Sequence, residues 1–197
     1  MKRILLTALL LALAFAAAGV AEPSAPESAA PSAPTAAPEN AFDTAGAPYA
    51  GTWVPFEDGF ALYLPSDWTC RDMDEEQAGS GLFYRAGNEA GDGGTAMGVA
   101  VGYMPVDGLE TMTDLLRDFA RAGFTGLRQR RRNGMSALAF VGPKGDYRGV
   151  AFYHPEYPGY AMIVYVTPVG AAGSAEEAVG RAILDSLSPW RMEEAGE

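Results

Sequence analysis

The sequence has very few of the side chains that hold metals or act as nucleophiles. Its 197 residues include one cysteine, Cys70, and one histidine, His154. One of each excludes the usual structural zinc sites, which need four such ligands, and a lone cysteine excludes a disulfide within the chain. No G-x-S-x-G pattern occurs, so the hydrolase left open is a cell-envelope enzyme that uses Cys70 or His154. We therefore predict a protein that is not an enzyme and holds no metal or cofactor.

Cys70 itself is expected to be structural. It lies two residues after Trp68, and free cysteines are among the most often buried residues. We predict that its side chain fills a small apolar space. A reactive thiol and a disulfide to a second chain are the alternatives.

No apolar run reaches the ~20 residues that a membrane-spanning helix needs. The run over residues 4–18 contains one threonine, follows two basic residues and precedes small residues at 19–21. This pattern is typical of a secretory signal peptide, so we predict cleavage after residue 21, with a retained membrane helix as the alternative. No cysteine follows the run at a lipid-attachment position. We expect export into the extracellular, periplasmic or cell-wall space, with no membrane span after cleavage.

Positive charge is scarce. The chain has 14 Lys and Arg against 25 Asp and Glu, a formal net charge of -11. Cleavage removes two basic and no acidic residues, so the exported form carries 12 minus 25, or -13. A surface this acidic repels nucleic acids at long range, and anionic lipids as well. We predict neither as a partner of the whole molecule.

The chain divides into a tether, a single domain and a tail. Residues 22–48 are mostly Ala, Pro, Ser and Glu, and a segment without large apolar groups cannot form a core. We predict a disordered Ala/Pro/Ser-rich tether there, one globular domain at 49–191, and an acidic tail at 192–197. The domain has 191 minus 49 plus 1, or 143, residues, which is enough for one core.

About seven strands and two helices are predicted. Alternating apolar residues mark strands at 53–56, 60–68, 81–87 and 96–104, and a meander follows within 127–167. The first helix is predicted to begin at Asp107, with Glu110 completing a capping box, and to end at Gly123. The second is predicted to begin at Ser174, with Glu177 three residues later.

An acidic segment, formed by Asp72, Asp74, Glu75 and Glu76, precedes the third strand. A calcium-binding EF-hand loop needs a glycine at its sixth position. Counted from Asp72, that position is Gln77. We therefore predict a solvated loop without calcium.

The meander begins with a hairpin whose turn is Asn133-Gly134. Both residue types tolerate positive φ, which a type I′ turn requires at both positions. The turn predicts three cross-strand pairs: Arg132 with Met135, Gln129 with Leu138, and Leu127 with Phe140.

Both faces of the meander are predicted to be apolar. One carries large residues, namely Leu138, Phe140, Val150, Phe152, Ile163 and Tyr165. The other carries small or narrow ones, namely Ala137, Ala139, Gly149, Ala151, Met162 and Val164. A sheet that is apolar on both faces must be covered on both. We therefore predict an α+β fold, a three-layer α/β/α sandwich with one mainly antiparallel sheet of six to seven strands and two main helices.

This arrangement resembles a known superfamily. The strand F-x-L-x-L-P-x-D-W at 60–68, the capped helix after the fourth strand, the meander and the closing ILDSLSPW at 183–190 look like the PsbP/Mog1-like α/β/α sandwiches. The resemblance covers nearly all of residues 49–191. It implies the sandwich fold and a binding or accessory role, as in photosystem assembly or the binding of a small GTPase. No functional residue of that superfamily maps onto this chain.

Arg128, Arg130 and Arg132 are the first candidate binding residues. Alternate residues of a strand project from one face, about 6.6 Å apart, with Arg131 on the other. Guanidinium groups bind carboxylate, sulfate and phosphate, so the hypothesis is an anion-binding stripe for an acidic peptide or a glycan of the envelope. The alternatives are pairing with acidic residues of the chain, or protection of an edge strand from aggregation.

Aromatic residues form the second candidate. Tyr157 lies in the turn HPEYPG, and Trp53 is a possible neighbour. Exposed rings stack on sugars or on partner proteins, but most aromatic residues serve the core. A glycan or protein contact at Tyr157 and Trp53 is therefore a hypothesis, with a place in the core as the alternative.

Overall fold

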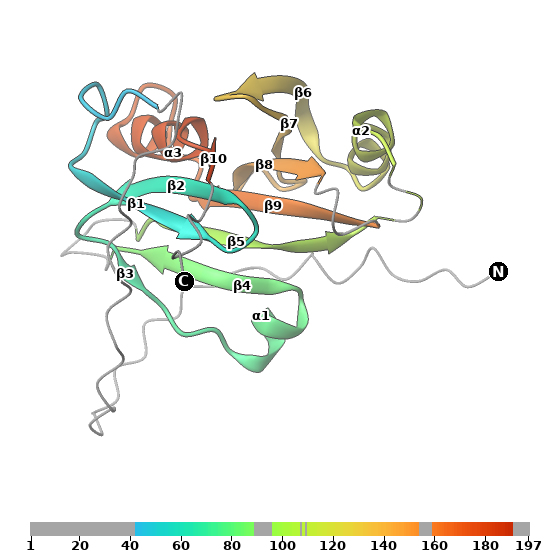
Figure 1. The fold of residues 1–197 in the computed structure, drawn as a ribbon, viewed down its shortest axis with the longest axis horizontal. Coiled ribbons are helices and arrows are strands. Elements are labelled where there is room, and N and C mark those ends of the chain that lie inside the picture. Colours follow the sequence, from blue (N-terminus) through green and yellow to red (C-terminus); the bar gives the residue numbers. More distant parts are fainter. Residues whose placement is uncertain (1–41, 89–95, 107, 109, 154–158, 191–197) are drawn as a thin grey trace, which may run out of the picture.

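The computed structural model of the protein describes residues 42–88, 96–106, 108, 110–153 and 159–190. Within those residues the fold is α+β, with a seven-stranded sheet, a three-stranded sheet and three helices (Figure 1). The large sheet has the spatial order β3 (Thr69–Cys70), β4 (Leu82–Gly87), β5 (Gly98–Pro105), β9 (Tyr160–Thr167), β8 (Arg148–Tyr153), β7 (Met135–Val141), β6 (Thr125–Arg132). Every neighbouring pair in it is antiparallel. The helices are α1 (Glu75–Gly79), α2 (Met112–Arg121) and α3 (Ala175–Asp185).

The first two strands form a separate sheet, so the prediction of a single sheet was wrong. β1 (Gly51–Phe56) pairs with β2 (Phe60–Pro65), and β2 also pairs with β10 (Ser188–Pro189). The Trp190 N–H donates to the Gly59 carbonyl at 2.8 Å. The end of the chain thus completes this sheet, and pairing over so long a sequence separation leaves no local signal.

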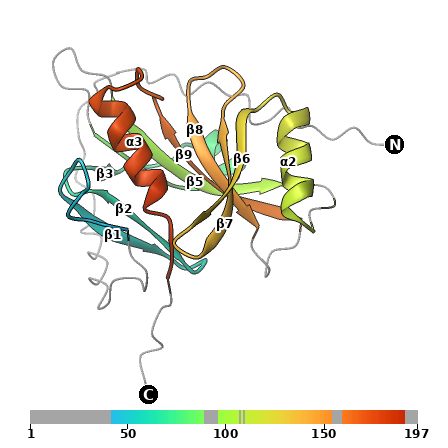
Figure 2. The ribbon, with the colours of Figure 1, turned by 90° about the horizontal axis from the view of Figure 1, so that it is seen from above.

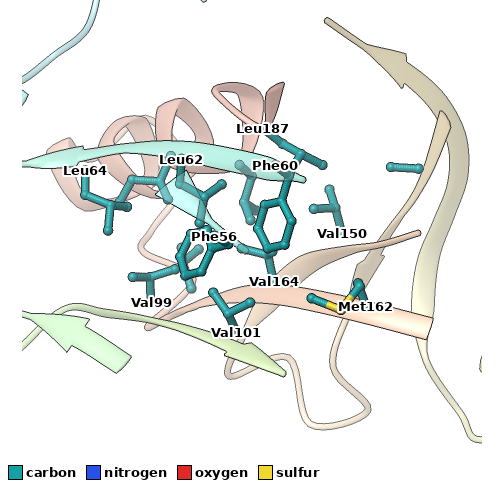
Figure 3. Packing of buried hydrophobic residues seen from close by; sticks show 14 of the residues in the cluster. Phe56, Phe60, Leu62, Leu64, Val99, Val101, Val150, Met162, Val164 and Leu187 are labelled. Carbon is teal, nitrogen blue, oxygen red and sulfur yellow. The ribbon is translucent and has the colours of Figure 1, made fainter. Parts of the chain in front are cut away.

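One face of the large sheet packs against the small sheet and α3. Phe60, Leu62 and Leu64 of β2 point toward the large sheet (Figure 3). They meet a layer of buried residues on β5, β8 and β9, namely Val99, Val101, Val150, Met162 and Val164. Ile183 and Leu187, in and after α3, join the same cluster. Burial of each such side chain stabilises the fold by about 1.5–3 kcal/mol.

The other face of the sheet packs against α2. Leu115 and Phe119 of this helix are buried, and the Phe119 ring lies 5.0 Å from that of Phe140 on β7. The same cluster contains Leu138 and Ile163. Seen from above, α2 and α3 stand at opposite ends of the sheet (Figure 2). The prediction that both faces of the large sheet are apolar is confirmed.

The hairpin turn is confirmed. Asn133 has φ 44° and Gly134 φ 91°, as a type I′ turn requires. Arg132 lies opposite Met135 and Gln129 opposite Leu138, as predicted. The third predicted pair, Leu127 with Phe140, falls in an irregular part of the ladder, where Leu127 has no regular partner. A register shift separates Thr125 from Arg128, where Gly126 has φ 62°, and Thr125 lies opposite Val141. A glycine in this conformation is typical of a β-bulge.

The predicted orientation of β8 was also wrong. Val150 and Phe152 belong to the face under α3, not to the face of Phe140. The Gly142 N–H donates to the Tyr147 carbonyl at 2.8 Å, which leaves a turn of four residues, 143–146. This length reverses the predicted orientation of the strand that follows, because a one-residue slip turns every side chain over. Large residues are therefore shared between both faces.

The first predicted helix begins later than expected. Thr111 is the N-cap of α2, and its side chain forms a capping box with Asp114. The proposed cap at Asp107 was therefore wrong, although Gly123, with φ 85°, follows the helix as predicted. Ser174 caps α3 as predicted and accepts from the Glu177 N–H at 3.1 Å. Two capping patterns stand close together before α2, and the helix begins at the second.

The acidic segment before β4 is not simply a loop. Asp74 caps the short helix α1, with Gln77 completing the capping box, and Glu75 and Glu76 occupy the first turn. Negative charge is favourable at a helix N-terminus. The presence of this helix does not alter the prediction that the segment lacks an EF-hand. No helix within the described ranges is long and apolar enough to cross a membrane.

Candidate functional site: an arginine face

The arginine-rich strand β6 forms one edge of the large sheet. Arg128, Arg130 and Arg132 lie opposite Ala139, Ala137 and Met135 on β7. This register puts the three arginines on one face of β6, as predicted, and it is the face that α3 covers farther along the sheet. Residues 128–131 are exposed and Arg132 is half-buried.

The tip of the β6–β7 hairpin is attached to the end of α3. The Asn133 side-chain amide donates to the carbonyls of Asp185 and Leu187, at 3.2 and 2.9 Å, and to the Ser188 Oγ at 2.9 Å. An Arg132 Nη lies 2.5 Å from an Asp185 Oδ. In Figure 2 the hairpin tip accordingly lies beside the C-terminal end of α3. These contacts hold the tip of the hairpin, including Arg132, against the end of α3.

A charged row on α3 continues the site. Glu177, Arg181 and Asp185 follow one another at intervals of four residues, which places them on one side of the helix. The Glu177 Oε1 accepts from Arg181 at 2.7 Å and from Arg148 of β8 at 3.4 Å. One carboxylate oxygen thus serves two guanidinium groups, and the bond to Arg148 is long. Within the described ranges, the buried Arg148 Nε has no hydrogen-bond partner.

Positive charge exceeds negative charge across this surface. We call it the arginine face and define it by Arg128, Arg130, Arg132, Arg148 and Arg181. Two carboxylates, Glu177 and Asp185, belong to it, so the local charge is five minus two, or +3. Arg128 and Arg130 form no ion pair with any residue that the structure describes. The excess stands out in a chain whose net charge is -11.

The two carboxylates respond to this surface in opposite ways. Burial raises the pKa of Asp185, and the nearby Arg132, Arg130 and Arg181 only partly oppose it. Glu177 has a lowered pKa, chiefly because the Gly173 N–H donates to it, with a further bond from Arg181. Burial thus disfavours the ionised form of Asp185, whereas hydrogen bonds favour the ionised form of Glu177.

The chemistry of the arginine face suits binding. Guanidinium groups stay charged at all physiological pH values and offer planar pairs of N–H donors to carboxylate, sulfate or phosphate. Nucleophilic and acid–base catalysis need a side chain that changes protonation near neutral pH. The described residues of the arginine face include none.

The environment of Cys70 differs from the predicted one. Its side chain is exposed, so the prediction of a small apolar filler was wrong. β3, on which it lies, has two residues and pairs only with β4, at the edge of the sheet opposite β6. His154 and Tyr157 lie outside the described residues, so a Cys70–His154 pair and a contact at Tyr157 stay predictions.

Trp53 lies apart from the arginine face, on β1. It is half-buried, and its ring lies 5.5 Å from that of Tyr63. Tyr49 stacks on Tyr63 at 5.7 Å and donates its Oη to the Tyr63 carbonyl at 2.8 Å. Burial raises the pKa of Tyr49. Trp53 thus belongs to a packed aromatic cluster on the small sheet, and its role in binding stays a hypothesis.

Sequence reasoning missed two members of the arginine face, Arg148 and Arg181. A signal for Arg181 was present, because the spacing of Glu177, Arg181 and Asp185 marks one side of a helix. No local signal links Arg148 to that helix.

The described part of the chain contains no group of three or more His, Cys, Asp and Glu residues that is arranged to hold a metal ion. No protein-family model matches the chain, and no curated protein matches it either. The arginine face is therefore defined by its geometry alone.

Proposed function

We propose that this protein is an exported, non-catalytic binding or accessory domain whose arginine face binds an anionic partner in the cell envelope or the extracellular space. The observation that carries the proposal is the local charge of +3 on a chain with a net charge of -11. Guanidinium groups crowded on one surface repel one another. Negative charge from outside relieves that repulsion.

Export and the finer fold belong to the same proposal. The signal-like segment 1–21 supports export and cleavage. The resemblance of residues 49–191 to the PsbP/Mog1-like superfamily supports a three-layer α/β/α sandwich with a non-catalytic role. The cover of α2 on one face and of α3 on the other agrees with that arrangement.

Salt-dependent retention on immobilised polyanions tests the proposal. The exported protein is recovered from expressing cells, its N-terminus is sequenced, and it is applied to polyglutamate and to dextran sulfate. The double variant Arg128→Gln/Arg130→Gln is expected to elute at lower salt on at least one of them, because two charges that bind the anion are lost.

A matched control removes the same charge elsewhere. Arg117 and Arg121 of α2 pair with Asp114 and Asp118, so Arg117→Gln/Arg121→Gln should elute like the wild type. Equal losses in both double variants would mean that net charge alone causes retention. That result, or no retention of the wild type, would refute the proposal.

The alternative, a cell-envelope hydrolase using Cys70 or His154, is favoured by one observation, the exposure of Cys70. Its test is hydrolysis of ester and peptide substrates by the exported protein and by Cys70→Ser. Turnover that Cys70→Ser abolishes would replace the binding proposal. Equal, background rates in both proteins would remove a role for Cys70.

A further inference from the structure

The outer side of β6 can accept another strand. β6 ends the strand order of the large sheet, and no other described segment pairs with its outer side. The bulge between Thr125 and Arg128 interrupts the regular ladder, so the regular edge covers residues 128–132. Five residues in register are enough for a short extended peptide.

The hairpin turn determines which backbone groups face outward. In a two-residue type I′ hairpin the residues that flank the turn, here Arg132 and Met135, bond to each other. Backbone groups alternate in direction along an antiparallel strand. Those of Arg130 and Arg128 therefore also face β7, whereas the N–H and C=O of Gln129 and Arg131 face away from the sheet.

The arginine side chains set the chemistry of the incoming strand. Residues directly opposite one another on adjacent strands have Cβ atoms about 4.5–5.5 Å apart. Every second side chain of an added strand would therefore stand next to Arg128, Arg130 or Arg132. Acidic side chains at alternate positions match this row, and Arg148 and Arg181 extend the positive charge beyond it.

The same row disfavours a second copy of this chain as the occupant. Antiparallel pairing of two β6 strands would bring arginines of one copy next to arginines of the other. Like charges directly opposite each other destabilise a strand pair, and charged residues on an edge strand protect against self-association.

We infer that β6 binds an extended acidic peptide by adding it as an eighth strand to the large sheet, with acidic residues at alternate positions beside Arg128, Arg130 and Arg132. The inference rests on the proposed function, because it assigns the anionic partner of the arginine face to one class, a peptide. Outward backbone groups of Gln129 and Arg131 supply the hydrogen bonds, and the arginines supply the selectivity.

Three labelled peptides test the inference by fluorescence anisotropy on the exported protein. One alternates Glu and Thr over eight residues, the second has the same composition in two blocks, and the third alternates Lys and Thr. The alternating acidic peptide is expected to bind most tightly. The block peptide is expected to bind at least about threefold more weakly, because it cannot pair every second side chain.

Two variants separate the backbone from the charge. Gln129→Pro removes the outward N–H without changing charge, and an edge strand tolerates proline where its N–H faces solvent. We expect it to weaken binding of the alternating peptide about tenfold, and Gln129→Ala to change it less than about twofold. Thermal unfolding checks that both variants are folded. Amide exchange at residues 129 and 131 should also slow when the peptide is bound.

Each result has one meaning. Full binding by Gln129→Pro, with binding lost in Arg128→Gln/Arg130→Gln, would overturn strand addition but leave the proposed function standing. Equal affinity for block and alternating peptides, or retention on dextran sulfate with no peptide binding, would do the same. A wild-type dimer that Gln129→Pro dissociates would show that β6 pairs with a second copy and overturn the inference. No retention on any polyanion would refute both proposals.

Discussion

The two edges of the large sheet, β3 and β6, solve the same problem in different ways. β3 has two residues, Thr69 and Cys70, and neither carries a charge. β6 has eight residues, four of them arginines. An unpaired edge invites another strand, and proteins counter this with short edge strands or with charge. β3 is protected by its length, whereas β6 is protected by its charge.

The difference explains why one edge is a candidate site and the other is not. A two-residue edge offers too few backbone groups for a partner. The charged edge repels most strands and its own copies, but an acidic strand removes that repulsion. The positive charge that protects β6 from other strands therefore also makes it selective for acidic ones. The position of Arg132 and Asn133 against the end of α3 keeps this edge in place.

Loss of the Asn133 hydrogen bonds at the tip of the β6–β7 hairpin should have the largest effect on stability. Asn133→Ala removes the bonds to Asp185, Leu187 and Ser188 and places an alanine at φ 44°. We expect a loss of about 2–3 kcal/mol in the free energy of unfolding, measured with urea. Asn133→Gly keeps the turn conformation and should lose only about 1–2 kcal/mol, the part due to the bonds.

Thr69→Ala on β3 is the control, because this exposed side chain makes only one hydrogen bond, at 3.5 Å, in the described structure. It should change the free energy of unfolding by less than about 0.5 kcal/mol. Equal losses for the alanine and glycine variants of Asn133 would contradict a contribution from backbone conformation.

Removal of charge from β6 should abolish its protection. Arg128→Thr/Arg130→Thr leaves a strand-forming edge without the two arginines that form no ion pair with a described residue. We expect self-association to rise at least about tenfold over that of the wild type, as measured by analytical ultracentrifugation. The same pair of changes at Arg117 and Arg121 of α2 should leave self-association unchanged. A monomeric β6 variant would mean that charge does not protect this edge.

The two carboxylates of the arginine face should show opposite pH dependences. The pKa of Glu177 is lowered from 4.5, so its ionised form stabilises the fold fully above pH 4.5, and this contribution is lost as pH falls through the folded pKa. The destabilisation caused by Glu177→Gln should therefore shrink on acidification. It is measured by urea unfolding between about pH 3 and 7.

The contribution of Asp185 to stability should have the opposite pH dependence. Its pKa is raised from 3.8, so its contribution is present below pH 3.8 and is lost as pH rises through the folded pKa. Asp185→Asn should accordingly gain stability relative to the wild type on going from acid to neutral pH. Its removal also deletes a negative charge beside Arg130 and Arg132, so the variant should be retained on immobilised polyanions to higher salt. Parallel pH profiles for the two variants would contradict this assignment.

Substitution of Cys70 on the short edge strand β3 should have the smallest effect on stability. The exposed Cys70 should react with a thiol reagent in the native protein within about threefold of its rate in urea, because no folding barrier protects it. Cys70→Ser should change the free energy of unfolding by less than about 0.5 kcal/mol. A native thiol that reacts a hundred times more slowly than the unfolded one would instead indicate burial.

Features that depend on a few neighbouring residues were predictable. Asn133 and Gly134 specify their turn by backbone preference alone, and the alternation in β6 then puts three arginines on one face. Ser174 was identified as a cap from its own spacing to Glu177. The start of α2 was not, because the pattern at Asp107 competes with the one at Thr111 and Asp114.

Features that depend on distant parts of the chain were not predictable. The orientation of β8 followed from a four-residue turn whose length the sequence does not reveal, and a one-residue error turns the whole strand over. The small sheet needs β10 to meet β2 across most of the chain. Arg148 joins the arginine face only because β8 and α3 lie side by side.

The sequence by itself thus determined the α+β class, the two apolar faces of the large sheet, the hairpin turn and the shared orientation of Arg128, Arg130 and Arg132. Local backbone preferences and the two-residue period of a strand suffice for these. Tertiary structure alone decided that β6 is an edge, that Cys70 is exposed, and that Arg148 and Arg181 join the β6 arginines. Each of these depends on which strands and helices become neighbours, and that choice is made by the packing of the whole core.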